Sequence, residues 1–298
     1  MLLTGCVGQA TAPLGPVAPV PPAPAAQTPA SPQASAPPPT APTCDAPAFA
    51  AAARANAIGL NTSPWMFSAG SNAKPEGPGW AMYVPAVQHT LRNPCAPATG
   101  AFAQALSVWQ AQHGLTPDGR MSRATAAALK AGWQAQRAHV GRPCLALARG
   151  QTAAIPAEAR YDARDARLAP QALADYLRLL AAARAALPDA FADGKLLSAV
   201  SPWRDPAADR AACARSPGLC NGTAKTAGCS AHWSGRAIDL NLGFIAGGDP
   251  TDSTYANRLH QSQSALYGWM LENAGRFGFV NYYYEPWHWE WQGDTMAP

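Results

Sequence analysis

Length, composition and charge set the first limits on this 298-residue chain. Only 13% of its residues are charged, and the net charge of +4 is too mild to indicate a nucleic-acid partner. It has no apolar run of about 18 residues or more, so we expect no membrane-spanning helix. A chain of this length has room for two domains once a linker is discounted.

Residues 1–47 read as an anchor followed by a disordered linker. Cys6 follows Leu3-Thr4-Gly5, which resembles the lipobox of bacterial lipoproteins, where the cysteine is lipidated after signal cleavage. Few residues precede it, so either the true start lies upstream or the likeness is chance. The following segment of Ala, Pro, Thr, Ser and Gln cannot bury enough apolar surface to fold. We expect an exported lipoprotein, periplasmic or otherwise associated with the cell envelope, whose membrane contact is a lipid at Cys6.

The remaining cysteines form an even set, which in an exported protein predicts disulfides. They are Cys44, Cys95, Cys144, Cys213, Cys220 and Cys229. Cys213 and Cys220 bracket a Ser-Pro-Gly loop and are the favoured local pair. Reduced, buried thiols in a cytosolic protein are the alternative, which fits the N-terminus poorly.

Residues 48–138 predict a small all-α domain of three short helices, preceded by an alanine-rich helix from Phe49 to Ile58. Apolar residues recur at helical spacing in three stretches, and Ser122 suits the N-cap of the last. The stripes are Val84, Val87 and Leu91, then Phe102, Leu106 and Trp109, then Ala128 and Leu129. Pro117-Asp118-Gly119 is typical of the turn between the last two helices.

The order of these residues resembles the peptidoglycan-binding module found beside many bacterial wall hydrolases. The likeness covers residues 81–133 and is carried by Phe102, Leu106, Trp109-Gln110, Gly114-Leu115, Pro117-Asp118-Gly119, Thr125 and Leu129. The first half departs from that family, because Asn93-Pro94-Cys95-Ala96-Pro97 replaces a glycine-bearing repeat. The resemblance implies glycan as a partner, and a purely structural helical domain is the alternative.

Residues 139–298 form the second predicted domain. A long helix from Pro170 to Leu187 carries the stripe Leu173, Leu177, Leu180 and Ala181, with the proline in its first turn. A buried strand is expected from Leu196 to Ser201, followed directly by Pro202-Trp203-Arg204.

Two motifs near the C-terminus hold the residues of a catalytic zinc site. They are Ser230-Ala231-His232-Trp233-Ser234-Gly235-Arg236-Ala237-Ile238-Asp239 and Glu285-Pro286-Trp287-His288. Two imidazoles and two carboxylates suffice for three metal ligands and a base that takes a proton from water.

Strand alternation places these groups. Ile238, Leu240 and Leu242 share one face and Asp239 the other, while Trp287, Trp289 and Trp291 lie opposite His288 and Glu290. Gly235 lets the loop before the first strand turn tightly, and Pro286 indicates a bend that presents Glu285. A closed structural site of Cys213, Cys220, Cys229 and His232 is the rival hypothesis. We expect His89, His113, His139 and His260 to be packed or surface residues.

These motifs resemble the zinc D-alanyl-D-alanine carboxypeptidase family of the vancomycin-resistance type, which includes L,D-carboxypeptidases and phage endolysin peptidases. The likeness runs from about residue 170 to Trp291 and takes in Ser201-Pro202-Trp203-Arg204 and residues 273–279. It implies an α+β fold, a small antiparallel sheet flanked by helices. It also implies His232, Asp239 and His288 as zinc ligands, Glu285 as the catalytic base, and Arg204 and Ser230 as substrate contacts. Trp203 and Asp209 depart from the family, which often has Tyr and Gln there.

The predicted function is therefore a zinc-dependent D-alanyl-D-alanine carboxypeptidase that trims peptidoglycan stem peptides. An L,D-carboxypeptidase or peptidoglycan endopeptidase of the same family is the runner-up. A non-catalytic wall-binding lipoprotein that keeps the peptidase scaffold is the alternative from another class.

Overall fold

The computed structural model describes residues 43–63, 77–137, 139, 144–192, 194–215 and 229–293. Residues 1–42 of the predicted N-terminal segment 1–47, with Cys6, lie outside these ranges, as does Cys220. Residues 42–298 form one compact unit. Within the described ranges, no helix is long and apolar enough to cross a membrane.

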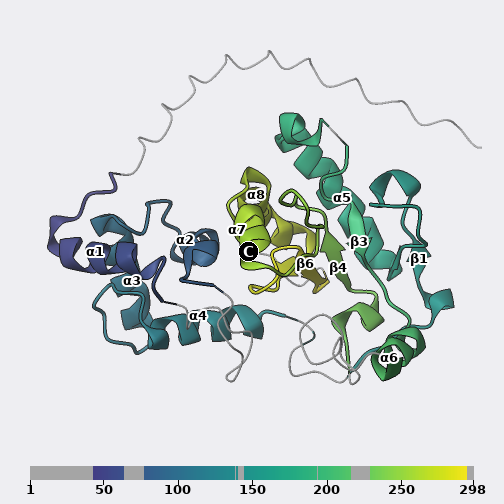
Figure 1. Ribbon diagram of the computed structural model, residues 1–298, viewed down its shortest axis with the longest axis horizontal. Coiled ribbons are helices and arrows are strands. Elements are labelled where there is room, and N and C mark those ends of the chain that lie inside the picture. Colours follow the sequence, from purple (N-terminus) through teal and green to yellow (C-terminus); the bar gives the residue numbers. More distant parts are fainter. Residues whose placement is uncertain are drawn as a thin grey trace, which may run out of the picture. The chain divides into compact units, whose positions relative to one another are not determined.

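The described part of the region predicted to be helical contains four α-helices (Figure 1). They are α1 (Ala50–Gly59), α2 (Val84–Leu91), α3 (Gly100–Gln112) and α4 (Arg123–Ala135). The side chains of Thr99 and Ser122 accept hydrogen bonds from backbone N–H groups in the first turns of α3 and α4, as N-caps do. The buried Asn56 of α1 joins the turn between them, donating to Gly119 O at 2.9 Å and accepting from Met121 N at 2.8 Å.

The core of this helical region also contains residues from near the C-terminus. Its buried members from the helices include Trp80, Phe102 and Leu106, and three consecutive tyrosines, Tyr282, Tyr283 and Tyr284, belong to the same cluster. Helix α2 contacts α8 (Ala265–Asn273) directly. The helical region therefore packs against the part of the chain that holds the second zinc motif.

A four-stranded antiparallel sheet forms the centre of the C-terminal region. Its strands are β3 (Ala199–Ser201), β4 (Ala237–Leu240), β5 (Phe279–Asn281) and β6 (His288–Trp291), in the order β3-β4-β6-β5. A second, two-stranded ladder joins β1 (Ala153–Ala154) to β2 (Arg167–Leu168). The predicted α+β class, a small antiparallel sheet with helices, is confirmed for this region.

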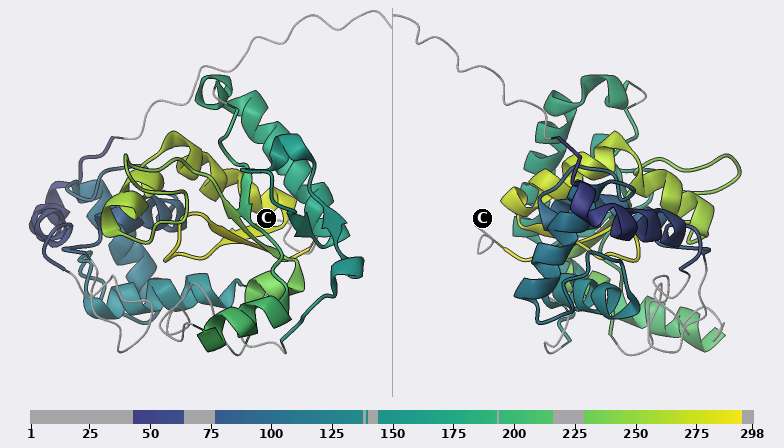
Figure 2. Two further views of the ribbon diagram at one scale, coloured as in Figure 1. Left: turned by 45° about the vertical axis from the view of Figure 1, so that its right-hand side comes forward. Right: turned by 90° about the vertical axis from the view of Figure 1, so that its left-hand side faces the viewer.

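Helices cover one face of the sheet (Figure 2). Helix α5 (Pro170–Ala186) and α8 pack their apolar residues against the strands. The shared core includes Tyr176, Leu179, Leu180, Leu266, Met270, Ile238, Leu240, Phe279, Trp289 and Trp291. The remaining α-helices of the described residues are α6 (Pro206–Arg215) and α7 (Tyr255–Ser262). The site is built on the face opposite this core.

Two sequence-based predictions of local structure need correction. The buried face of α5 runs through Ala172, Leu173, Tyr176, Leu179, Leu180 and Ala183, whereas Ala181 is exposed, because Tyr176 and Leu179 carry the contact instead. The predicted strand from Leu196 is shorter, because Leu197 has a left-handed φ of 55° and Ser198 N closes a turn on Lys195 O.

Two disulfides are present among the described cysteines, Cys44–Cys95 and Cys144–Cys229. Cys213 is also disulfide-bonded. The predicted pair Cys213–Cys220 involves a residue outside the described ranges. Because Cys213 and Cys229 are oxidised, the closed structural zinc site of three cysteines and His232 is wrong.

Candidate metal centre

Two of the predicted ligands face each other across adjacent strands. Asp239 of β4 and His288 of β6 are direct partners in the antiparallel register. Side chains at such opposed positions begin about 4.5–5.5 Å apart at Cβ, so they meet without distortion. Accordingly, Nδ1 of His288 lies 2.8 Å from Oδ1 of Asp239. Ile238 and Trp289, one residue along, point into the core and fix this orientation.

The third ligand comes from a short 3₁₀ turn, η8 (Ala231–Ser234), directly before β4. Nε2 of His232 lies 3.5 Å from Oδ1 of Asp239. The turn ends at Gly235, whose φ of +65° is left-handed. A Cβ there would come within 2.8 Å of the backbone nitrogen of Ala169, so glycine is required both by conformation and by space.

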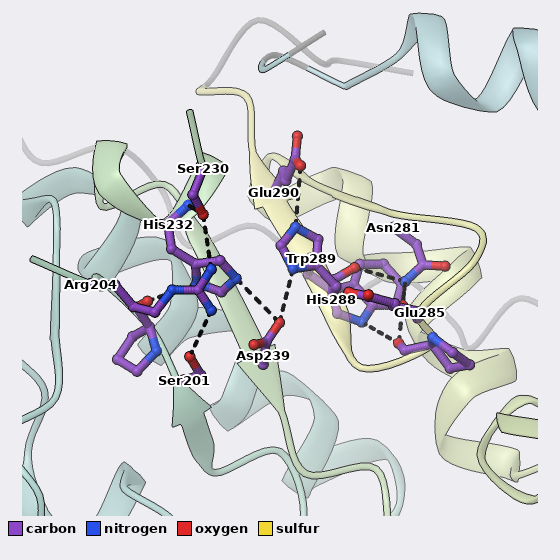
Figure 3. A network of polar contacts seen from close by, with 12 residues as sticks. Ser201, Arg204, Ser230, His232, Asp239, Asn281, Glu285, His288, Trp289 and Glu290 are labelled. Atoms are coloured by element: carbon purple, nitrogen blue, oxygen red, sulfur yellow. Dashed lines mark hydrogen bonds and ion pairs between the residues drawn. The ribbon is translucent and has the colours of Figure 1, made fainter. Parts of the chain in front are cut away.

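The three side chains converge on one point, as Figure 3 shows. One ligand atom from each of His232, Asp239 and His288 lies within 4.8 Å of the others, and all three residues are buried. A tetrahedral ion with bonds of about 2.0–2.2 Å keeps its ligand atoms roughly 3.3 Å apart, so small side-chain movements suffice to admit one. The donor set of two imidazoles and one carboxylate fits a divalent transition metal.

Hydrogen bonds orient both imidazoles. Nδ1 of His232 lies 2.7 Å from the carbonyl oxygen of Pro202, which only a protonated Nδ1 can satisfy, so Nε2 keeps its lone pair toward Asp239. On the ring of His288, Nε2 lies 3.2 Å from Oε1 of Glu290. The other ring nitrogen, Nδ1, therefore faces the carboxylate of Asp239. Such partners on the far nitrogen are the usual support of metal-binding histidines.

The three buried side chains change one another's pKa values. Burial alone raises the pKa of Asp239, but the adjacent imidazoles outweigh it and hold that pKa well below its usual range. Burial lowers the pKa of His288, yet the hydrogen bonds to Asp239 and Glu290 outweigh burial and raise it to about 9. Burial dominates at His232 and lowers its pKa. Without a metal, one proton therefore sits on His288 while His232 is neutral at pH 7.

Glu285 occupies the bend that the sequence predicted before β6. Its backbone N–H donates to Tyr282 O at 2.9 Å, and its carbonyl accepts from the N–H of His288 at 2.9 Å, so two successive turns lead into the strand. The residue is buried and lies beside His288 in Figure 3. Its negative charge contributes to a raised pKa of Tyr282, after burial and the charge of Tyr283.

Asn281 holds this bend together and was not singled out from the sequence. Its side-chain amide donates to the carbonyl oxygens of Glu285, Pro286 and His288 at 3.3, 3.2 and 2.9 Å. The amide oxygen accepts from the hydroxyl of Tyr267 at 3.0 Å, which fixes the side chain in place. An Asn four residues before a Glu-Pro dipeptide carries no recognisable sequence signal.

Arg204 follows β3 and lies beside the first motif. Its Nη2 donates to the hydroxyl of Ser230 at 2.9 Å, and its Nε donates to Oδ2 of Asp209 at 3.0 Å. The same Asp209 oxygen accepts from the indole N–H of Trp233 at 2.9 Å. Asp209 therefore anchors the guanidinium, and Ser230, which also caps the 3₁₀ turn of His232, holds it from the other side.

Two further residues complete the surroundings of His288. Glu290 was predicted to share its strand face, and it is 2% exposed. Arg137, just beyond α4, binds the carboxylate of Glu290 although 153 residues separate them. Burial is the main reason for the lowered pKa of His139, and the nearby charges of Glu290 and His288 also affect this pKa. His113, by contrast, stacks on Trp109 with ring centroids 3.9 Å apart, in the helical region.

The comparisons with known proteins give a likeness to a solved structure but none to a protein family. No protein-family model matches the chain, and a search of the curated proteins finds no match. Among solved structures, the chain is similar to the LdcB LD-carboxypeptidase, whose structure is described as revealing the molecular basis of peptidoglycan recognition. The identity is 19%, the match covers 50% of this chain and 71% of that one, and the TM-score is 0.38. A score of this size supports no inference, so the function rests on the residues of the site.

Proposed function

We propose that this protein is a zinc-dependent D,D-carboxypeptidase that removes the terminal D-alanine of peptidoglycan stem peptides. The observation that carries the proposal is the convergence of His232, Asp239 and His288 at one buried point. Two imidazoles and one carboxylate are a ligand set of catalytic zinc sites, and zinc held there supplies Lewis acidity that brings the pKa of a water molecule close to 7.

Glu285 is the proposed general base. It takes a proton from the water that attacks the peptide carbonyl, and it returns that proton to the amine nitrogen as the C–N bond breaks. Its place on a bend clamped by Asn281, directly before the strand of His288, supports this role. A rigid bend keeps the carboxylate at a constant distance from the reacting water, which general-base catalysis requires.

Arg204 is the proposed substrate contact, together with Ser230. A guanidinium binds a carboxylate through two parallel hydrogen bonds, so an arginine near the reacting carbonyl selects a peptide with a free C-terminus. The anchoring of Arg204 by Asp209 and Ser230, beside His232, supports this role. Stabilisation of the tetrahedral oxyanion is the other role open to this side chain.

Peptidoglycan is proposed as substrate from the two sequence resemblances, which share the cell wall as their context. The disulfides agree with export, because such bonds persist in oxidising compartments. The helical region is proposed to contact glycan, and a lipid at Cys6 to hold the protein at the membrane.

The deciding experiment incubates the full chain, loaded with zinc, with defined muropeptides and follows their masses. Loss of D-alanine from a pentapeptide but not from a tetrapeptide is expected. Loss from the tetrapeptide identifies an L,D-carboxypeptidase, and internal cleavage an endopeptidase. Loss from neither, in a folded and zinc-loaded sample, overturns the enzymatic proposal and leaves a wall-binding protein. Arg204→Gln should raise KM for the pentapeptide at least tenfold if the guanidinium binds the terminal carboxylate.

A further inference from the structure

One charged side chain at the end of the helical region, Arg137, reaches the surroundings of the metal centre. Arg137 lies two residues beyond the end of α4, and its guanidinium binds Oε1 of Glu290 through both Nε, at 3.1 Å, and Nη2. The side chains are 10% and 2% exposed, respectively, so the pair is buried. Arg137 thus joins a helix of the N-terminal half to the strand that carries His288.

The guanidinium is held in place from two more sides. Its Nη1 donates to Oε1 of Gln134 at 2.7 Å, one turn earlier in the chain. Its central carbon lies 4.1 Å from the ring centroid of Tyr282, a favourable cation–π distance. Tyr282 itself precedes the bend of Glu285. Arg137 is therefore fixed by its own helix and by the loop that leads into β6.

Glu290 transmits this constraint to the ligand. The oxygen that accepts from Arg137 also lies 3.2 Å from Nε2 of His288, whose Nδ1 faces Asp239. The second oxygen, Oε2, is buried and has no hydrogen-bond partner among the described residues. A buried carboxylate that has no hydrogen bond at one oxygen depends on the partners of the other oxygen. Without Arg137, His288 would be the only hydrogen-bond partner left to the carboxylate of Glu290 among the described residues.

We infer that Arg137 is a positioning residue of the metal centre. It holds Glu290 in the orientation that receives the Nε2–H of His288, and so it keeps Nδ1 aimed at the position of the ion. The helical region is then a structural part of the site rather than a separable binding module. The inference rests on the proposed function only in requiring that His232, Asp239 and His288 hold a divalent metal.

The test measures zinc affinity of the full chain by competition with a chromophoric chelator. Loss of such outer support typically costs 10–100-fold in metal affinity, so Arg137→Gln should weaken zinc binding by about that factor. Arg137→Lys keeps the charge but not the two-pronged contact, so its zinc affinity should lie between that of the wild type and that of Arg137→Gln. Arg123→Gln is the matched control, because Arg123 is an exposed arginine at the start of the same helix; it should match the wild type.

A double-mutant cycle separates positioning from a general loss of stability. If Arg137 acts through Glu290, then Arg137→Gln should change zinc affinity less than twofold in a Glu290→Gln background. Zinc affinity within twofold of the wild type in folded Arg137→Gln protein overturns the inference while the proposed function stands. Equal losses in both backgrounds also overturn it. A wild-type chain that binds no zinc overturns both proposals.

Discussion

Nδ1 of His288 lies 2.8 Å from Oδ1 of Asp239, across two adjacent strands of the sheet. In the metal-free protein this contact is an ion pair, because His288 keeps its proton up to a pKa of about 9 and the pKa of Asp239 is lowered. A metal that takes the same two atoms must therefore displace a proton. Before a metal binds, a proton on His288 keeps this side chain and Asp239 in contact.

Metal binding should accordingly release about one proton per ion between pH 7 and 8. The folded-state pKa of His288 is raised, so the proton is present below about pH 9, whereas the lowered pKa of His232 means that its ring contributes none. Zinc affinity should rise up to tenfold per pH unit until about pH 9 and then level off. Calorimetry in two buffers of different ionisation enthalpy counts the protons. A pH-independent affinity from pH 6.5 to 8.5 would contradict the assignment of His288.

Glu285→Gln should slow turnover strongly while leaving the metal in place. The amide has the size of the carboxylate but cannot accept the proton of the attacking water, a contribution of about 10²–10⁴-fold. We expect kcat to fall by at least 100-fold, with zinc affinity within a few-fold of the wild type. Glu158→Gln, at an exposed site, serves as control. Substantial remaining activity in the zinc-loaded variant would remove Glu285 from its proposed role.

Asp209→Asn should weaken substrate binding more than the chemical step. The carboxylate of Asp209 accepts from both Arg204 and Trp233, and the amide would lose the charge that pairs with the guanidinium. With its anchor weakened, Arg204 should bind the terminal carboxylate less well, which predicts a rise in KM of roughly tenfold, about 1.4 kcal/mol. Steady-state kinetics on the pentapeptide check this, with the exposed Asp189→Asn as control. An unchanged KM would mean that Arg204 does not depend on Asp209.

Asn281→Asp should destabilise the bend of Glu285. The substitution keeps the shape of the side chain but replaces the amide donor with an oxygen that faces three carbonyl groups. Loss of these hydrogen bonds should lower the free energy of unfolding by about 1–3 kcal/mol. Urea unfolding monitored by tryptophan fluorescence measures it, and activity should fall with the displaced Glu285. The exposed Asn61→Asp provides the comparison. A variant as stable as the wild type would show that Asn281 is not needed to hold the bend.

The strands of the site could be predicted because they alternate. Ile238 and Leu240 next to Asp239, and Trp289 and Trp291 next to His288, define one apolar face each, so the polar faces followed from a period of two residues. The register that brings Asp239 opposite His288 could not be derived in this way, because nothing local to either strand specifies its partner.

Contacts over long sequence distances were the part that could not be predicted. Arg137 follows a helix and reads as an ordinary surface residue, and only the packed structure brings it to Glu290. Asp209 was noticed solely as a departure from a family pattern, whereas the structure shows a buried carboxylate with two donors. Leu197 misled the strand prediction because side-chain type does not reveal a left-handed φ. Each of these depends on tertiary packing, which overrides local preference.

The disulfide between Cys144 and Cys229 has a consequence for handling the protein. Cys229 lies one residue before Ser230 and three before His232, so the bond tethers the start of the segment that delivers the first imidazole. Reducing agents would free that segment and raise the entropy lost when the imidazole is brought into place. Reduction of this disulfide should therefore weaken zinc retention, although it changes none of the three ligand residues. Zinc affinity and kinetic constants should therefore be measured on protein folded under oxidising conditions.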